Sequence, residues 1–262
     1  MSKLHIYIDG SWLFSACKPS GVLANATATP ETAFKLDFAR LSNALLAHCA
    51  AKEAGITLGE QIISTSIFEV PAAAKTWADS DPDLLPADLE KTKRNIVSRD
   101  IFVKRARAGK YSEEAVYRPV LRPYIVKALA RGSYQEKLVD ATIVALLVRN
   151  AITMPSDFHV VLTGDADILP AINVAYPKFT RNVFVSTTHP DELKKEHRSS
   201  SFSISEYPFE IEPFYLQDHV QTIMAGAHIY LCGSCRKPYE SQRAVTRPQR
   251  PYCPTCLVKK RT

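Results

Sequence analysis

The stretch "VVLTGDADILPAI", residues 160–172, ends an apolar run in two closely spaced aspartates. Its β-branched first part predicts a buried strand, and Asp165 and Asp167 follow directly after the strand end. Like charges placed so close together repel and raise each other's pKa. A divalent cation bound between the acids removes that cost, so the stretch points to a metal site at the end of a strand.

Similar strand patterns alternate with helical patterns along the rest of the chain. Strands are predicted at residues 4–9, 61–70, 158–164 and 181–188, with a final short strand region at 201–213. Helices are predicted at 34–55, 134–152, 167–176 and 190–198. Residues 86–100 indicate a further helix, whereas "IFVKRARAGK" (101–110) indicates a strand running into a turn. This alternation favours an α/β fold, a mostly parallel sheet flanked by helices, which we place at residues 1–218.

Length and composition fit one good-sized domain with a small appendage. The chain has 262 residues, of which 46% are hydrophobic and 23% charged, as in ordinary soluble globular proteins. Its start, "MSKLHIYIDGSWLF", turns acidic too early for a signal peptide. No run approaches the roughly 18 apolar residues of a membrane span. We therefore expect a cytoplasmic protein that has no membrane partner.

The net charge of +6 is unevenly distributed. Residues 91–137 hold 13 Lys/Arg against 4 Asp/Glu, residues 232–262 hold 8 against 1, and the remainder carries −10. Taken singly, each basic segment is better explained as a solvated surface. Two basic segments beside an acidic body favour a polyanion such as nucleic acid that approaches an acidic, metal-binding centre.

Four aspartates are candidate ligands of one metal site. Asp9 ends the first predicted strand, Asp165 and Asp167 follow a later strand, and Asp140 lies in the first turn of a buried helix. Ligands bind at the carboxyl ends of strands in open α/β sheets, and carboxylate oxygens suit Mg²⁺ or Mn²⁺. Such a site can polarise a phosphate and activate water. The alternative explains each acid separately: Asp9 as a turn residue, Asp140 as a charge favoured at a helix N-terminus, and Asp167 as an N-cap.

The C-terminal segment, residues 228–262, carries the most specific motif of the chain. Cys232 and Cys235, then Cys253 and Cys256, form two C-x₂-C pairs 17 residues apart, within the spacing of zinc ribbons. Four thiolates leave no open coordination position, so this zinc would be structural and would stabilise a module too small to fold alone. Disulfide pairs are the alternative, which a reducing compartment disfavours.

The two remaining cysteines, Cys17 and Cys49, lie outside this segment and are interpreted as ordinary buried thiols. The segment itself has one further, less specific feature. A basic surface with interleaved tyrosines could bind nucleic acid or an acidic protein surface, and it consists of Arg236, Lys237, Arg243, Arg247, Arg250, Tyr239 and Tyr252.

Four segments resemble, in order and spacing, the NYN domain of the PIN-like nuclease superfamily: "IYIDGSW", "KLVD", "VLTGDADILPAI" and "NVFVSTT", within residues 3–215. The resemblance implies a Rossmann-like sheet and a Mg²⁺- or Mn²⁺-dependent acidic site that cleaves RNA. It matches Asp9, Asp140, Asp165 and Asp167 to the acids of the family. It also matches Lys137 to a lysine that often precedes the helix acid and could contact a phosphate; the alternative is a plain solvated lysine.

The chain departs from the family pattern in two places. The family usually has Asn soon after "DG", where this chain has Ser11 and Trp12. Ser11 could replace the amide in part, and Trp12 could stack on a base or simply pack. The usual "SGDSDF" becomes "TGDADIL". These changes leave the carboxylates in place.

The sequence therefore predicts a metal-dependent ribonuclease with a zinc ribbon that assists nucleic-acid or protein binding. The aspartates serve as catalytic and metal-binding residues, and the expected substrate-binding residues are Ser11, Trp12, Lys137, Arg105 and Arg107. The alternative function is a non-catalytic RNA- or protein-binding module on the same fold. A phosphatase of the haloacid-dehalogenase type is disfavoured, because those enzymes begin with D-x-D and Asp9 is followed by Gly10 and Ser11.

Overall fold

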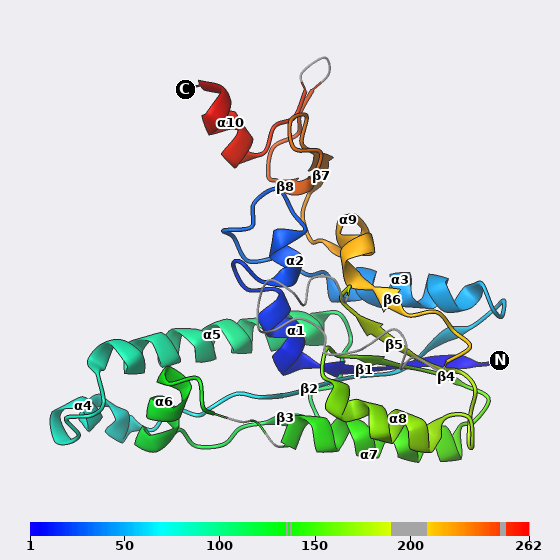
Figure 1. Ribbon diagram of the computed structural model, residues 1–262, viewed down its shortest axis with the longest axis horizontal. Coiled ribbons are helices and arrows are strands. Elements are labelled where there is room, and N and C mark those ends of the chain that lie inside the picture. The colour runs from blue at the N-terminus through cyan, green and yellow to red at the C-terminus, as the bar shows by residue number, and fades with distance from the viewer. Residues whose placement is uncertain (135, 137, 190–208, 247–249, 262) are drawn as a thin grey trace.

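Six parallel strands form the central sheet of the protein, in the order β3-β2-β1-β4-β5-β6 (Figure 1). The structure is a computed structural model that describes residues 1–134, 136, 138–189, 209–246 and 250–261. The strands are β1 (Lys3–Asp9), β2 (Thr57–Ser66), β3 (Val116–Tyr117), β4 (Phe158–Leu162), β5 (Val183–Thr187) and β6 (Phe214–Tyr215). Every neighbouring pair is parallel, which confirms the predicted α/β class.

The strand order reverses between β1 and β4. The chain starts in the middle of the sheet, adds β2 and β3 on one side of β1, and then adds β4, β5 and β6 on the other side. The carboxyl ends of β1 and β4 flank this reversal, which is where open α/β sheets bind ligands. Asp9 is the last residue of β1, and Thr163 directly follows β4. The topology therefore brings two predicted acids, Asp9 at the end of β1 and Asp165 two residues after Thr163, to one edge of the sheet.

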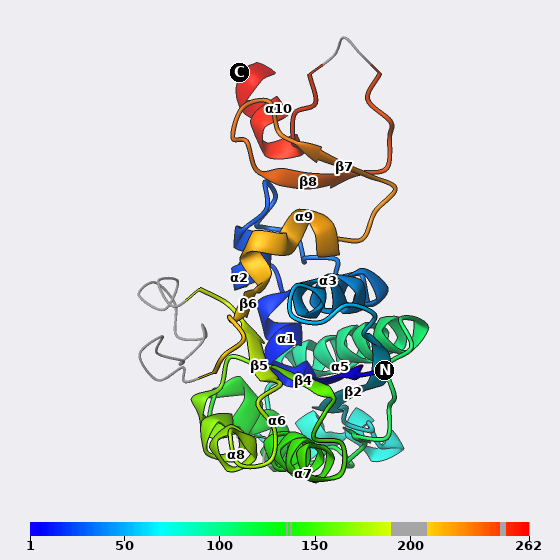
Figure 2. The ribbon, with the colours of Figure 1, turned by 90° about the vertical axis from the view of Figure 1, so that its right-hand side faces the viewer.

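Helices cover both faces of the sheet (Figure 2). One face carries α1 (Gly10–Ala16), α3 (Phe38–Ala50) and part of α5 (Pro86–Ala108), and the other carries α7 (Leu138–Thr153) and α8 (Leu169–Ala175). Successive β1 side chains point to opposite faces. Ile6 and Ile8 pack with the α1 and α3 side, whereas Tyr7 packs with the α7 side. Asp9 has the same parity as Tyr7, so it points toward the start of α7.

Helix α5 corrects the strand predicted at residues 101–110. It continues unbroken to Ala108, and Phe102, Val103 and Ala106 are its buried residues in that stretch. These three residues are spaced at i, i+1 and i+4, which places them on one face of a helix, and the basic side chains between them point to solvent. Around the first half of α5, the short elements η1 (Ala72–Lys75), α4 (Trp77–Ser80) and α6 (Pro123–Ala130) enclose a separate apolar cluster.

The helix predicted at residues 190–198 lies outside the described residues, as do residues 201–208 of the final predicted strand region. The described part of that region, residues 209–213, contains no strand. The last strand of the sheet is instead β6, and its two residues pair with the end of β5. Within the part of the chain that the structure describes, no helix combines the length and apolar character needed to cross a membrane.

The C-terminal segment packs on the residues around α2 (Val22–Asn25) (Figure 1). After η5 (Leu216–His219) and α9 (Val220–Ile223), it forms the antiparallel strands β7 (His228–Leu231) and β8 (Pro238–Ser241) and ends in α10 (Pro254–Arg261). Ala28 belongs to the buried cluster that contains Cys232, Tyr239 and Cys253. The backbone N–H of Ala28 donates to the carbonyl of Pro238 at 2.9 Å. The segment is therefore fixed to the main domain and shares its small core with it.

Candidate active site and cysteine cluster

Asp9 is the buried centre of the acidic site. Its side chain is 4% exposed. One carboxylate oxygen, Oδ1, accepts the backbone N–H groups of Ser11 (3.1 Å) and Trp12 (2.9 Å), which caps the N-terminus of α1. The other oxygen, Oδ2, accepts the hydroxyl of Thr163 at 3.1 Å, which joins the ends of β1 and β4. Three hydrogen bonds thus hold this carboxylate in one orientation.

The electrostatic environment of Asp9 is unfavourable for a bare carboxylate. The pKa of Asp9 is raised to about 7, mainly by burial and also by the charges of Asp140 and Glu136, and this value already includes the lowering effect of the Trp12 and Thr163 hydrogen bonds. A carboxylate with this pKa is partly protonated at neutral pH unless a cation compensates its charge. The site is therefore a cluster of negative charges that a bound cation would stabilise.

Asp140 connects Asp9 with the two aspartates after β4. It lies in the first turn of α7 and is half-buried. Burial raises the pKa of Asp140, followed by the charges of Asp165, Glu136 and Asp167. The start of α7 is fixed over the sheet because the hydroxyl of Ser64, at the end of β2, donates to the carbonyl of Val139 at 3.2 Å. The four predicted aspartates are therefore electrostatic neighbours, linked through Asp140.

The loop after β4 orients Asp165 and Asp167 differently. The N–H of Asp165 donates to the Thr163 hydroxyl at 3.1 Å, and Oδ1 of Asp165 accepts the N–H of Asp167 at 2.9 Å. Asp165 is half-buried and Asp167 exposed. Asp165 thus starts the short helical turn η2 (Ala166–Ile168), while the Asp167 carboxylate is left to solvent.

Glu136 is a fifth acid of the site that the sequence patterns did not single out. Its Oε2 atom accepts from Arg99 Nη1 at 3.4 Å, and its Oε1 atom is buried with no hydrogen-bond partner in the described structure. The one available signal was its position four residues before Asp140, just upstream of the α7 start. Arg99 also donates to the carbonyl of Ser66 at 3.0 Å, so this cation lies at the edge of the acidic site.

The charges of the carboxylates act on one another, but the carboxylates do not form a tight ligand cage. Among the described residues, the group of histidine, cysteine and acidic side chains whose ligand atoms all lie within 4.8 Å of one another consists of cysteines, not aspartates. Mg²⁺ commonly keeps several waters and uses one or two direct carboxylates. The donor set of Asp9, Asp140 and Asp165, with the unpartnered Glu136 oxygen, fits such a partly hydrated ion.

The predicted substrate-binding residues lie in different places. The Ser11 hydroxyl is 3.0 Å from the Thr65 hydroxyl and accepts from Arg99 at 3.4 Å. The indole of Trp12 packs so tightly on Gly164 that a Cβ there would lie 2.0 Å from Trp12 Nε1, a buried N–H with no acceptor in the described structure. Arg105 and Arg107 are exposed on α5, and Lys137 lies outside the described residues.

The four C-terminal cysteines converge on one point. The Sγ atoms of Cys232, Cys235, Cys253 and Cys256 all lie within 4.8 Å of one another. A tetrahedral ion with bonds of ~2.3 Å places its sulfur ligands about 3.8 Å apart, so this set fits a metal ion such as zinc. Burial opposes ionisation of the Cys232 thiol, but nearby backbone N–H groups, that of Cys253 first, lower its pKa, which favours the thiolate that metals bind.

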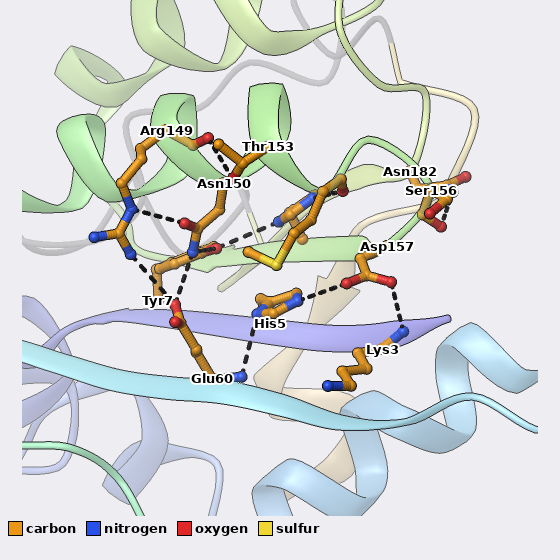
Figure 3. A network of polar contacts seen from close by, with 12 residues as sticks. Lys3, His5, Tyr7, Glu60, Arg149, Asn150, Thr153, Ser156, Asp157 and Asn182 are labelled. Atoms are coloured by element: carbon orange, nitrogen blue, oxygen red, sulfur yellow. Dashed lines mark hydrogen bonds and ion pairs between the residues drawn. The ribbon is translucent and has the colours of Figure 1, made fainter. Parts of the chain in front are cut away.

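A second polar cluster occupies the opposite, amino-terminal part of the same strands (Figure 3). The backbone N–H of Glu60 donates to His5 Nδ1, so His5 Nε2 carries the proton donated to Asp157 at 3.0 Å. His159 Nε2 donates to the carbonyl of Met154, which leaves Nδ1 to accept the Tyr7 hydroxyl at 3.3 Å. Burial lowers the pKa of His159 to about 4.

This second cluster uses its polar atoms internally. Asn150 donates through Nδ2 to both Tyr7 and Glu60 at 2.8 Å, and Arg149 donates to Asn150 Oδ1 at 2.8 Å. The neutral histidine tautomers satisfy every ring nitrogen named above. The cluster therefore cross-links α7, β1, β2 and β4, and it is a structural feature of the fold.

Comparisons of the chain with protein-family models, with curated proteins and with solved structures found no match.

Proposed function

We propose that the protein is a metal-dependent ribonuclease whose active site is the acid cluster at the carboxyl ends of β1 and β4. One observation carries this proposal: Asp9 is buried at the reversal of strand order, and the charged groups that act most strongly on it are further carboxylates, Asp140 and Glu136. Buried like charges are costly for stability alone. A divalent cation that engages a phosphodiester explains why they are gathered there.

The roles of the acids follow from how firmly each is held. Asp9 is fixed by three hydrogen bonds and defines the position of the ion. Asp140 and Asp165 are half-buried and contribute the adjustable ligands, and the exposed Asp167 adds negative charge at the rim. When bound, Mg²⁺ or Mn²⁺ supplies a Lewis acid for the phosphate and lowers the pKa of a water. The preference for RNA over DNA rests on the resemblance to the NYN domain.

The C-terminal module completes the proposal. Its four thiolates bind a structural zinc ion, and the surrounding arginine, lysine and tyrosine side chains contact RNA or an acidic protein partner. Zinc at this place is supported by the sulfur-only ligand set. The catalytic ion is expected to be Mg²⁺ or Mn²⁺ because the other site offers oxygen ligands.

A second candidate is an RNA- or protein-binding module that does not cleave. Two observations favour it: the carboxylates do not all lie within 4.8 Å of one another, and Trp12 fills the space over Gly164 near the position at which the NYN pattern has asparagine. In this case the fold and the basic surfaces would serve recruitment alone.

Cleavage of end-labelled single-stranded RNA distinguishes the two candidates. The protein is assayed with Mn²⁺, with Mg²⁺, and in resin-treated buffer free of divalent ions, which avoids stripping zinc with a chelator. Asp165→Asn is the test variant, and Asp79→Asn, an exposed acid on α4, is the matched control. Metal-dependent cutting that Asp165→Asn loses and Asp79→Asn keeps supports the ribonuclease. Tight binding without cutting by the wild type supports the binding module, and neither binding nor cutting refutes both.

A further inference from the structure

A groove runs along α5 beside the acidic site. One cavity of about 300 Å³ is lined at its inner end by Ser66 and Glu136, which belong to the edge of the acid cluster. A second cavity of about 360 Å³ extends to Phe34 and Arg105. The two share Phe14, Lys18 and Asn95 in their linings and are therefore neighbours along α5. We call this feature the α1–α5 groove, after the two helices that form its walls, which lie side by side in Figure 1.

The charged side chains of the α1–α5 groove are mostly basic. Lys18, Lys91, Arg99 and Arg105 line it, against the two acids Asp88 and Glu136. Lys91 and Arg105 are exposed, near opposite ends of the groove. A row of cations along a groove matches the repeated phosphates of an extended polyanion better than it matches one compact anion.

Aromatic rings form part of the same lining. Phe14 lies between two cations, with Lys18 Nζ 4.8 Å and the Arg99 guanidinium 5.3 Å from its ring centre. Tyr134 lines the inner cavity and Phe34 the outer one. Neutral polar side chains, among them Asn95, lie between the cations. Phe14 and Phe34 are themselves buried, so of these three rings the half-buried Tyr134 is the one that a base can contact. Cations that bind phosphates beside a ring that contacts a base are typical of sites for single-stranded nucleic acid.

Arg99 marks the junction between groove and acids. Its Nη1 donates to Glu136 and Ser11 at 3.4 Å each and to the Ser66 carbonyl at 3.0 Å. The two long contacts are weak, so a phosphate oxygen can replace them without loss of a strong bond. A phosphate held by Arg99 would therefore lie next to the acid cluster. It would neighbour the phosphate that the proposed metal ion engages.

We propose that the α1–α5 groove binds single-stranded RNA next to the scissile phosphate. Lys91, Arg99 and Arg105 hold backbone phosphates of the strand, and a base contacts Tyr134 on the apolar side of the groove. That a phosphate next to the groove is cleaved rests on the proposed ribonuclease function. The binding of the strand to the groove does not depend on that function. The two cavities together have the size of a small-molecule site, which is enough for roughly two nucleotides.

The test removes two exposed groove cations and compares them with two cations on the same helix. The groove variant is Lys91→Gln/Arg105→Gln, and the control is Arg94→Gln/Lys104→Gln, which makes the same charge change at exposed positions outside the groove lining. Binding of a fluorescein-labelled 12-nucleotide single-stranded RNA is measured by anisotropy at several salt concentrations, without Mg²⁺ or Mn²⁺. Circular dichroism melting of both variants checks that they fold.

The groove variant is expected to bind at least about tenfold more weakly than the control, with a shallower salt dependence by about 1.4 in the log–log slope, as for two lost phosphate contacts. Equal affinities of the two variants overturn the groove proposal. So does a poly-glutamate peptide that competes as well as the RNA, since it assigns the groove to an acidic protein segment.

Cleavage in Mn²⁺ keeps this result apart from the proposed function. Groove-dependent binding without any cutting supports the groove and refutes the ribonuclease. Cutting that the groove variant performs as well as the control supports the ribonuclease and refutes the groove.

Discussion

Replacing Asp9 by asparagine should stabilise the metal-free protein, although the substitution removes a proposed catalytic group. Asparagine is isosteric and caps helices about as well as aspartate, so the cap of α1 is kept. What the substitution removes is a buried negative charge whose pKa is raised from 3.8 to about 7. The stability of the active site and its function are therefore expected to oppose each other at this residue.

The magnitude follows from the pKa of Asp9. Between pH 3.8 and about 7 the folded protein retains a proton that the unfolded chain has lost, so stability falls as pH rises through this range. Each unit of pKa difference corresponds to about 1.4 kcal/mol, which makes the full cost about 4 kcal/mol above pH 7. Of this cost, about 3 kcal/mol arises between pH 5 and pH 7. The stability gained by Asp9→Asn should therefore be about 3 kcal/mol larger at pH 8 than at pH 5.

The assay is urea denaturation of both proteins at pH 5 and pH 8 in buffer free of Mg²⁺ and Mn²⁺. The informative quantity is the difference in unfolding free energy between variant and wild type at each pH. His159 titrates in an overlapping pH range and changes the stability in the opposite direction, but it does so equally in both proteins. Asp37→Asn, which removes the half-exposed capping carboxylate of α3, is the matched control for the loss of a capping charge. Added Mn²⁺ should stabilise the wild type and not Asp9→Asn. A stability difference that is the same at pH 5 and pH 8 would refute the buried charge cluster.

Three further predictions concern other parts of the molecule. Gly164→Ala should destabilise by about 1–3 kcal/mol, since its Cβ would meet the Trp12 indole at 2.0 Å, and Trp12→Leu in the same chain should restore part of the melting temperature. Acidification from pH 6.5 to 4 should lower the stability of the wild type relative to His159→Gln by about 3 kcal/mol in urea denaturation, because His159 is buried and neutral in the folded protein and only the unfolded chain gains its proton. Cys253→Ser should lower the zinc content measured by mass spectrometry from one ion per chain to none, whereas Cys49→Ala, at a buried free thiol, should leave it unchanged.

The strand-end acids could be predicted from the sequence because their signal is local. An apolar run followed by a polar residue marks a strand end, and parallel strands place such ends at one edge. Glu136 and Arg99 could not be predicted in this way. The sequence placed Glu136 in the first turn of the helix predicted at 134–152 with no sign that it faces Asp9, and Arg99 is one of many cations on α5 until folding places it beside Ser66. Their roles depend on tertiary contacts that no short window of sequence contains.

The errors in the predicted fold have similar causes. The 101–110 segment was predicted as a strand because Ile101, Phe102 and Val103 are strand formers, but packing against the α1 and α3 side of the sheet outweighs that propensity. The helix predicted at 134–152, which the structure describes from Leu138 to Thr153, was expected to be buried, yet Leu138 and Ile152 are half exposed. β3 and β6 have two residues each, too few to show an alternating pattern.

The attachment of the C-terminal module to the main domain could not be predicted from the sequence either. This attachment links the two proposed metal sites. Helix α1 begins at the Asp9 cap, and the segment that follows it supplies Lys18 and Phe34 to the α1–α5 groove. Between those two residues lies Ala28, which is buried against the cysteine cluster. Lys237 and Thr255 bind the same segment, through the carbonyl of Asn25 at 2.9 Å and the carboxylate of Glu31 at 3.2 Å.

One continuous segment therefore runs from the acid site, past the groove, to the cysteine cluster. Because a module of this size depends on its metal for stability, loss of the metal should also release the outer wall of the groove. Cys253→Ser should then weaken single-stranded RNA binding even though it changes no groove residue, and Cys49→Ala should not. If Cys253→Ser loses zinc and binds RNA as tightly as the wild type, the module is an independent appendage, and the groove owes its shape to α1 and α5 alone.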